Sequence, residues 1–338
     1  MTQKTILTGV KPTGAPHVGN YIGAIRPALR LADSHARSYL FIADYHALNA
    51  VQDAKALRHD SYEVAATWLA LGLDPHKTVF YRQSDVPEIF ELMNILCAVT
   101  PKGLMDRSHA YKAMVDKNRE AGRDVDADVN MGLYTYPILM AADILGPAAD
   151  LVPVGKDQVQ HVEFARDMAG YFNNTFKTDV FRLPEYQLEQ GTSGAILPGI
   201  DGRKMSKSYN NHIPCFMDSL ARRKLVMKIV SDSKRPEEPK NPDENAIFQI
   251  YSHFATDADI AVMRSAFEKG GMGYGDAKQL LFEALEKSFE APTKIYQSYM
   301  AETPKLDALL QEGASRARVV VRDTLSRARE AVGLKVLA

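Results

Sequence analysis

Residues 5–20 read TILTGVKPTGAPHVGN, and this stretch decides the fold. An apolar run begins at Thr5 and stops at Gly9, and a turn rich in glycine and proline follows. From Asn20 to Ala32, apolar residues recur at helical spacing. The stretch therefore predicts a strand, a turn and a helix, which is the unit from which parallel sheets are built.

The same alternation continues along the first half of the chain. Buried strands are predicted at residues 38–43, 79–81 and 150–155, and helices at residues 54–71, 89–98, 132–145 and 158–172. We expect an α/β fold, a doubly wound parallel sheet of the Rossmann-like type with helices on both faces.

After about Phe216 the pattern is helical only. Helices are predicted at residues 218–229, 246–254, 257–267, 275–299 and 305–332, and Pro292 should kink or split the fourth. The stretch 190–202, rich in proline and glycine, is the clearest linker. We expect a catalytic domain at residues 1–198, a mobile loop at 199–216 and an all-helical domain at 217–338, whose last helix folds back onto the first domain.

The amino-acid composition excludes several classes of protein. The 338 residues are 46% hydrophobic and 25% charged, as in an ordinary globular protein, and the net charge of −1 predicts no general attraction to nucleic acid. Two distant cysteines, Cys97 and Cys215, exclude a disulfide framework and a four-cysteine metal site. The N-terminus does not read as a signal segment, and no apolar run approaches the ~20 residues that cross a bilayer. We expect a cytoplasmic protein without membrane contact.

The turn after the first strand suits a nucleotide. Gly14 permits a tight turn, Gly19 and Asn20 let a ligand approach a helix N-terminus, and free N–H groups there favour anions. The pattern is neither a dinucleotide fingerprint nor a P-loop. Taken alone, it also fits an ordinary glycine-rich turn that carries a histidine, His17.

A second stretch, residues 202–208, reads GRKMSKS. Lys204 and Lys207 stand on a loop bracketed by glycines before and by Asn210 and Asn211 after. Two ammonium groups on such a loop suit a mobile clamp that neutralises polyphosphate. Taken alone, the loop is equally explained as a solvated basic surface.

Together, in this order and at this separation, the two stretches resemble the ATP-handling signatures of class I aminoacyl-tRNA synthetases. The resemblance implies that His17, Lys204 and Lys207 are catalytic and stabilise the charge that develops as an adenylate forms. It implies ATP with Mg²⁺ as cofactors and no dedicated metal site on the protein. The expected ATP contacts are Lys11, Pro12, Thr13, Gly19, Asn20, Gly155, Lys156, Asp157, Ile196, Lys204, Met205, Ser206, Lys207 and Ser208.

The helix at residues 134–145, YTYPILMAADIL, indicates which amino acid is activated. Met140, Asp143 and Ile144 share one helical face, so a carboxylate lies among apolar side chains. An indole N–H is a donor only and suits an ionised carboxylate in an apolar slot. The alternative is an aspartate in a salt bridge between helices.

This helix and residues 152–161, VPVGKDQVQH, resemble the substrate-binding segments of tryptophanyl-tRNA synthetases. The resemblance implies that Tyr136 and Gln158 hold the substrate α-ammonium. It also implies a homodimer and a helical domain that binds the tRNA anticodon. Lys11, Met114 and Lys156 depart from the usual family residues. The expected tryptophan contacts are Leu7, His46, Tyr136, Met140, Asp143, Ile144, Val152, Val154 and Gln158.

The expected function is therefore ligation of L-tryptophan to tRNA(Trp) by way of tryptophanyl-adenylate. The alternatives are a tyrosyl-tRNA synthetase, a nucleotidylyltransferase of the same fold, and a binding protein that has kept the fold. For tRNA contact the sequence offers two helices with basic residues, each also explained as solvated surface. These residues are Arg222, Arg223, Lys224 and Lys228 on one helix, and Arg316, Arg318, Arg322, Arg327 and Arg329 on the other.

Overall fold

The computed structural model describes residues 4–35, 37–188 and 197–335. Its strands are β1 (Thr5–Val10), β2 (Arg37–Ile42), β3 (Thr78–Arg82), β4 (Leu151–Val154) and β5 (Glu185–Leu188). Its α-helices are α1 (Val18–Asn20), α2 (Arg26–Ser34), α3 (Asp44–Ala47), α4 (Ala54–Ala70), α5 (Glu88–Cys97), α6 (Lys102–Met105), α7 (His109–Glu120), α8 (Met131–Leu145), α9 (Val159–Phe176), α10 (Ser219–Met227), α11 (Ala246–Tyr251), α12 (Asp257–Lys269), α13 (Tyr274–Ala301) and α14 (Thr303–Ala331). Short helical turns are η1 (Tyr21–Ile25, a π-helix), η2 (Gln83–Asp85), η3 (Lys156–Gln158) and η4 (Lys207–Tyr209).

The strands form a parallel sheet, which confirms the predicted fold class. In the part of the chain that is described, the strand order is β3-β2-β1-β4-β5. The chain proceeds outward from β1 through β2 to β3 and then crosses to β4 on the other side of β1. The order thus reverses between β1 and β4, and sheets of this kind bind ligands beside the carboxyl ends of the strands at that point.

Alternate side chains of the strands fill a separate core on each face of the sheet. Tyr39 and Phe41 of β2 pack with α5, α8 and α9, whereas Leu40 and Ile42 pack with α4 and the end of η1. This alternation is the two-residue period of an extended strand, and burial on both faces explains why the strands read as continuous apolar runs.

Helix α14 lies along the outer edge of β3. It contributes Leu306 and Leu310 to the core on one face, and Ala314 and Val321 to the core on the other. Between these pairs stands Gly313, where a Cβ would collide with the backbone carbonyl of Phe80 in β3. The predicted return of the last helix onto the α/β region is therefore observed, and it covers a strand edge.

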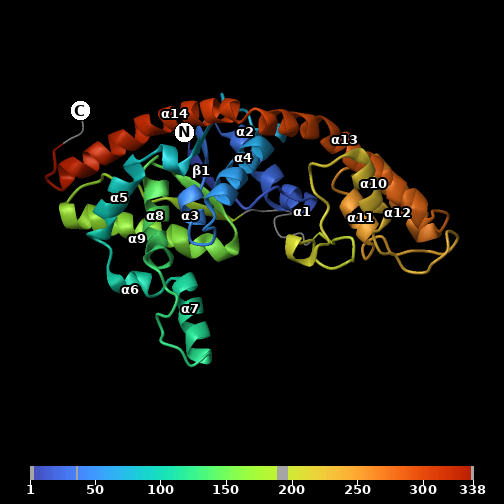
Figure 1. Cartoon of the computed structure of the whole chain (residues 1–338), viewed down its shortest axis with the longest axis horizontal. Helices are drawn as coiled ribbons and strands as arrows, with labels where there is room; N and C mark the ends of the chain where they lie inside the picture. Colours follow the sequence, from blue (N-terminus) through green and yellow to red (C-terminus); the bar gives the residue numbers. More distant parts are fainter. Residues whose placement is uncertain (1–3, 36, 189–196, 336–338) are drawn as a thin grey trace.

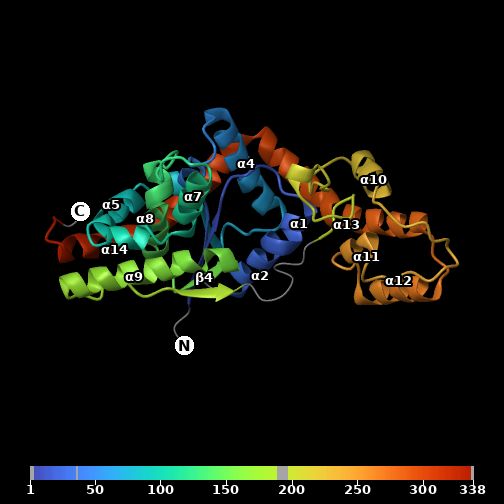
Figure 2. The same ribbon diagram turned by 90° about the horizontal axis from the view of Figure 1, so that it is seen from below.

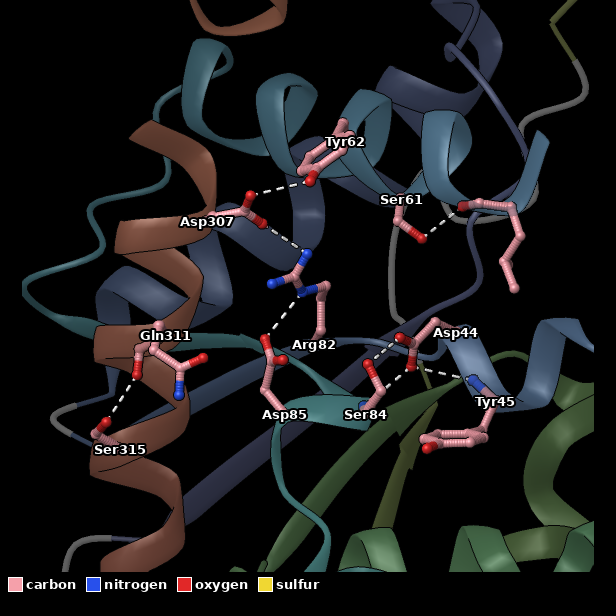
Figure 3. A network of polar contacts seen from close by, with 11 residues as sticks. Asp44, Tyr45, Ser61, Tyr62, Arg82, Ser84, Asp85, Asp307, Gln311 and Ser315 are labelled. Atoms are coloured by element: carbon pink, nitrogen blue, oxygen red, sulfur yellow. Dashed lines mark hydrogen bonds and ion pairs between the residues drawn. The ribbon is translucent and has the colours of Figure 1, made fainter. Parts of the chain in front are cut away.

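Ion pairs and hydrogen bonds also hold α14 in place. Asp307 accepts from Arg82 at the end of β3 (2.8 Å) and from the Tyr62 hydroxyl on α4 (3.0 Å), and Arg82 also pairs with Asp85 (Figure 3). Further along, Arg318 and Arg322 both pair with Glu88 at the start of α5.

The remaining arginines of α14 are engaged in the same way. Arg316 donates to the Pro75 and His76 carbonyls, Arg327 to the Val180 carbonyl, and Arg329 pairs with Glu91. All five arginines that the sequence offered on this helix therefore anchor it to the α/β region. Contacts with distant residues of the chain therefore account for these five arginines, although Arg322 and Arg327 also remain exposed.

A third core joins α10–α13 to the lysine loop. Met205 and Cys215 from the loop pack with Val18 of α1 and with Phe248 and Phe267 of the helices. Figures 1 and 2 show α10–α12 gathered at one end of the molecule, and α13 leads from them toward the α/β region that contains the sheet. The division into domains at residues 198 and 216 stays a prediction, and part of its linker lies outside the described residues.

Three local expectations differ from the structure. Strand β5 was not predicted, because its sequence EYQL is polar and it lies at the sheet edge. The helices α6 and α7 were also missed; α7 projects away from the sheet (Figure 1), and Val115 is the one apolar residue that it buries. Helix α13 continues through Pro292 without a split, because Phe289 before it and Tyr296 after it are both packed against cores.

The expectation that Arg222 on α10 is available for tRNA contact is also corrected by the structure. Its side chain is 1% exposed and donates to Glu286 (2.8 Å) and to the Cys215 carbonyl (3.0 Å). It therefore supports the packing of α10 on α13 and presents no charge to a partner. Arg223, Lys224 and Lys228 remain exposed.

Candidate active site

A cavity of about 700 Å³ opens at the switch point between β1 and β4. The ends of these strands form its floor, the inward face of α8 forms one wall, and the turn before α1 with part of the lysine loop forms its rim. Nothing in residues 4–35, 37–188 or 197–335 clusters three or more histidine, cysteine or acidic side chains as a metal site would, and no helix there is long and apolar enough to cross a membrane.

The apolar end of the cavity contains every residue that the sequence predicted for the amino acid. All nine lie in the lining: Leu7, His46, Tyr136, Met140, Asp143, Ile144, Val152, Val154 and Gln158. Phe41, Thr67 and Trp68 also line the cavity. Strand ends and one helical face bring these distant residues together, as the motifs implied.

Asp143 is the charged group of this end and is 3% exposed. Its oxygens accept from the Gln83 amide (2.9 and 2.8 Å) and face the His46 Nε2 at 2.9 Å. Burial raises the pKa of Asp143, while His46 and Gln83 oppose that rise. The carboxylate is thus held by Gln83, directly after β3, and by His46 on the short helix α3. The predicted alternative, a pairing between helices, corresponds here to the contact of α8 with α3.

Gln83 in turn fixes the neighbouring turn. Its Oε1 accepts from the Tyr45 backbone N–H (3.2 Å), and Asp44 accepts from the Tyr45 and Ser84 backbone N–H groups (3.0 and 3.1 Å) and from the Ser84 hydroxyl (Figure 3). The sequence analysis missed Gln83, because a single glutamine after a strand carries no motif.

Tyr136 lines the cavity together with Gln158. Its hydroxyl lies 2.9 Å from Nε2 of His161, and the two rings meet edge to face with centroids 5.1 Å apart. Burial raises the pKa of the Tyr136 hydroxyl, so it is uncharged at neutral pH. An uncharged phenol can both donate and accept, and its neighbours decide which.

His17 stands at the polar end and caps α1. Its Nδ1 accepts from the Asn20 backbone N–H (3.2 Å), and the Asn20 side chain accepts from the His17 backbone N–H (3.1 Å). Burial, with His212 and Lys207 nearby, lowers the pKa of His17 to about 4. The ring is therefore neutral near pH 7, and because Nδ1 is an acceptor, the proton resides on Nε2, which can donate to an anion in the cavity.

Asn211 organises the lysine loop. It is 1% exposed, donates to Asp201 (2.7 Å) and to the Lys204 carbonyl (3.0 Å), and accepts from the Ser206 N–H (2.8 Å). In the sequence this residue was recognisable only as a bracket of the loop. Its buried amide instead fixes the loop from within.

Lys207 reaches across to the turn after β1. Its ammonium donates to the Thr13 carbonyl (3.0 Å) beside Gly14, whose φ of +79° is open to glycine. Carboxylates of Asp60 and Glu63 on α4 border the same turn, and the Lys207 charge counteracts a burial-driven rise in the pKa of Asp60. The lysine thus rests on neutral and acidic groups at the cavity rim.

The residues expected around ATP fall into three groups. Lys11, Thr13, Asn20, Gly155, Ser206 and Lys207 line the cavity, whereas Pro12, Gly19, Lys156, Asp157, Lys204, Met205 and Ser208 do not. Met205 is buried in the third core, and Lys204 is exposed. Ile196 lies outside the described residues.

Comparisons with known proteins point in one direction. The chain matches the family described as tRNA synthetases class I (W and Y) over residues 2–290. It is 47% identical to the tryptophan–tRNA ligase of Neisseria meningitidis, over 100% of both chains, and 49% identical to that of Pseudomonas aeruginosa, over 98% of this chain and 74% of the relative.

Solved structures agree with these relatives. The crystal structure of tryptophanyl-tRNA synthetase from Campylobacter jejuni with ADP and tryptophan is 39% identical, has a TM-score of 0.87, and covers 98% of this chain and 100% of its own. A tyrosyl-tRNA synthetase from Aeropyrum pernix is 16% identical with a TM-score of 0.62, over 92% of this chain and 90% of its own, which is a likeness of fold alone.

Proposed function

Because the chain belongs to the class I tRNA synthetases for tryptophan and tyrosine, we propose that its cavity activates L-tryptophan and that the protein is a tryptophan–tRNA ligase. In the first step a tryptophan carboxylate oxygen attacks the α-phosphorus of ATP. The bond from that phosphorus to the bridging oxygen breaks, and pyrophosphate leaves. In the second step the 2′-hydroxyl of the terminal tRNA adenosine attacks the activated carbonyl, releases AMP and gives up its proton.

The assignment of tryptophan as the substrate rests on one observation. A buried carboxylate, Asp143, faces a cavity lined by Met140, Ile144, Val152 and Val154. An indole fills such a slot with apolar surface and offers one N–H to the carboxylate. Tyrosine would present a hydroxyl that needs partners of both kinds, and Met140 supplies none.

The polar end supports phosphoryl chemistry. We propose that the Nε2–H of neutral His17 donates to the α-phosphate, where negative charge grows as the fifth bond forms. Lys207 needs only to leave the Thr13 carbonyl to reach a phosphate, and Lys204 needs a larger movement of the loop. Mg²⁺ arrives with ATP as part of the substrate. The other ATP contacts expected from the sequence stay predictions.

The helical region is our candidate for the tRNA. Arg223 and Lys224 on α10 and Lys228 directly after it are exposed, do not line the cavity, and can contact phosphates without reading sequence. Assembly into a homodimer and residence in the cytoplasm also stay predictions; light scattering on the purified protein tests the first.

ATP–pyrophosphate exchange with each of the twenty amino acids, followed by aminoacylation of purified tRNA, tests the function. We expect exchange with tryptophan and attachment to tRNA(Trp). Exchange with tyrosine alone would support the tyrosyl alternative. Exchange without any amino acid would favour a nucleotidylyltransferase, and no exchange at all would favour a binding protein.

A further inference from the structure

His161 is buried beside the tryptophan end of the cavity but does not line it. It stands on α9 one turn after Gln158, is 3% exposed, and its Nε2 lies 2.9 Å from the Tyr136 hydroxyl. Its Nδ1 is buried and has no hydrogen-bond partner among the residues that the structure describes. Tyr136 is therefore the polar contact that this imidazole makes.

Packing does not account for a histidine here. The ring also meets Phe164 edge to face, and an apolar side chain would fill this space without an unpartnered nitrogen. Whichever tautomer is present, one ring nitrogen is left without a partner at a cost in free energy. A functional role for the contact between His161 and Tyr136 therefore explains why a histidine stands at this position.

The two tautomers have different consequences for Tyr136. With the ring proton on Nδ1, the bare Nε2 accepts the single proton of the phenol, and the Tyr136 oxygen can then act only as an acceptor toward a donor in the cavity. With the proton on Nε2, the phenol accepts from the ring, and its own proton competes with an incoming cation. A substrate ammonium, which is a donor only, needs the first arrangement.

The surroundings keep the ring uncharged. Burial, together with His109, Lys11 and His46, lowers the pKa of His161 to about 4, and Asp157 opposes that shift only in part. At neutral pH the imidazole therefore retains an acceptor nitrogen.

We propose that His161 is a positioning residue that accepts the hydroxyl proton of Tyr136 and thereby makes the Tyr136 oxygen an acceptor for the α-ammonium of the substrate. This inference rests on the proposed activation of tryptophan. It gives His161 an indirect part in recognition of the amino group, through Tyr136, although His161 does not touch the substrate.

The test compares three ligands: tryptophan, tryptamine, which keeps the ammonium, and indole-3-propionate, which lacks it. His161→Phe should weaken binding of tryptophan and tryptamine by roughly tenfold, the loss of about one hydrogen bond to a charged group. Binding of indole-3-propionate should stay unchanged. His161→Gln, whose amide oxygen reaches the position of Nε2, should restore most of the loss. In exchange kinetics the change should fall on KM for tryptophan more than on kcat.

Tyr136→Phe provides the matched background. Adding His161→Phe to it should cause no further loss for tryptophan, because the contact is already gone. Equal weakening of all three ligands, or a full additional loss in the double variant, would overturn the proposal. If His161→Phe does not fold, ¹⁵N NMR of the wild-type ring decides: a bare Nε2 supports the proposal and a protonated Nε2 overturns it. Absence of tryptophan-dependent exchange in the wild type would refute the proposed function. The NMR measurement of the His161 tautomer would still test the contact between His161 and Tyr136.

Discussion

Removal of the Asp143 carboxylate tests how the cavity distinguishes its substrate. A carboxylate offers about four lone-pair positions, and Gln83 and His46 occupy three of them with contacts of 2.8 to 2.9 Å. One position remains on Oδ1, the oxygen that accepts from Gln83 only. We expect the indole N–H of tryptophan to donate there.

The magnitude follows from this contact. A hydrogen bond to a charged group contributes about 1.5–3 kcal/mol, which corresponds to roughly 10- to 150-fold in kcat/KM. Asp143→Ala also leaves Gln83 and His46 without their acceptor, so activity will fall for a second reason that has no relation to the indole. A single substrate cannot separate the two effects.

Two substrates can separate them. In β-(3-benzothienyl)alanine a sulfur replaces the N–H, and the shape of the ring system is kept. The wild type should prefer tryptophan by about 10- to 150-fold in pyrophosphate exchange, because the analogue leaves the carboxylate without its donor. Asp143→Ala should reduce this preference to within about threefold, by loss of the one contact that distinguishes the substrates.

Gln83→Met is the matched control. It disturbs the same network but keeps the acceptor for the indole, so overall activity should fall while most of the preference remains. An Asp143→Ala enzyme that still preferred tryptophan by the wild-type factor would refute the reasoning, and the carboxylate would then be a structural group.

Four further outcomes follow from the structure. Lys207→Ala should slow adenylate formation more than it weakens ATP binding, since the lysine rests on a carbonyl and must move; a rise in the KM for ATP alone would contradict this. Arg222→Met should lower the free energy of unfolding by about 2 kcal/mol in urea titration, because the half-buried Glu286 carboxylate loses the donor that pairs with it; an unchanged midpoint would place the charge in solvent. The pKa of His17 is lowered to about 4, so the unfolded chain binds more protons than the folded one between pH 6.5 and 4, and stability should fall as the pH drops through this window; His17→Gln should flatten the fall in urea midpoints measured at pH 7 and 4.5. Reversing the charges of Arg223 and Lys224 should leave pyrophosphate exchange near wild type and reduce aminoacylation with a flatter salt dependence; equal loss of both activities would argue against a role in tRNA contact.

The parallel sheet and the amino-acid end of the cavity could be predicted because their signals are local. Buried strands appear in the sequence as apolar runs. On the helix that carries Met140 and Asp143, a spacing of three and four residues indicates which side chains share the functional face. Motifs at strand ends then converge, since parallel strands end at one edge of the sheet.

The groups that the sequence analysis missed act through contacts between distant positions. Gln83 matters because of a carboxylate 60 residues away, and nothing around it in the sequence indicates that partner. Asn211 acts through two main-chain groups as well as through Asp201, and main-chain atoms have no sequence signature. The sequence was misleading at Arg222, because a guanidinium is expected at the surface and its partly buried acceptor, Glu286, lies 64 residues away.

The position of α14 has a consequence for how the chain is made. The edge of β3 is exposed as soon as that strand is synthesised, but the helix that covers it begins only at Thr303. Translation at about 5–20 residues per second takes roughly 10 to 45 s to cover the ~220 residues between Arg82 and Thr303. During that interval a nascent α/β region carries an open, apolar strand edge of the kind that pairs with other chains. We therefore expect chains that stall before α14 to aggregate or to require a chaperone.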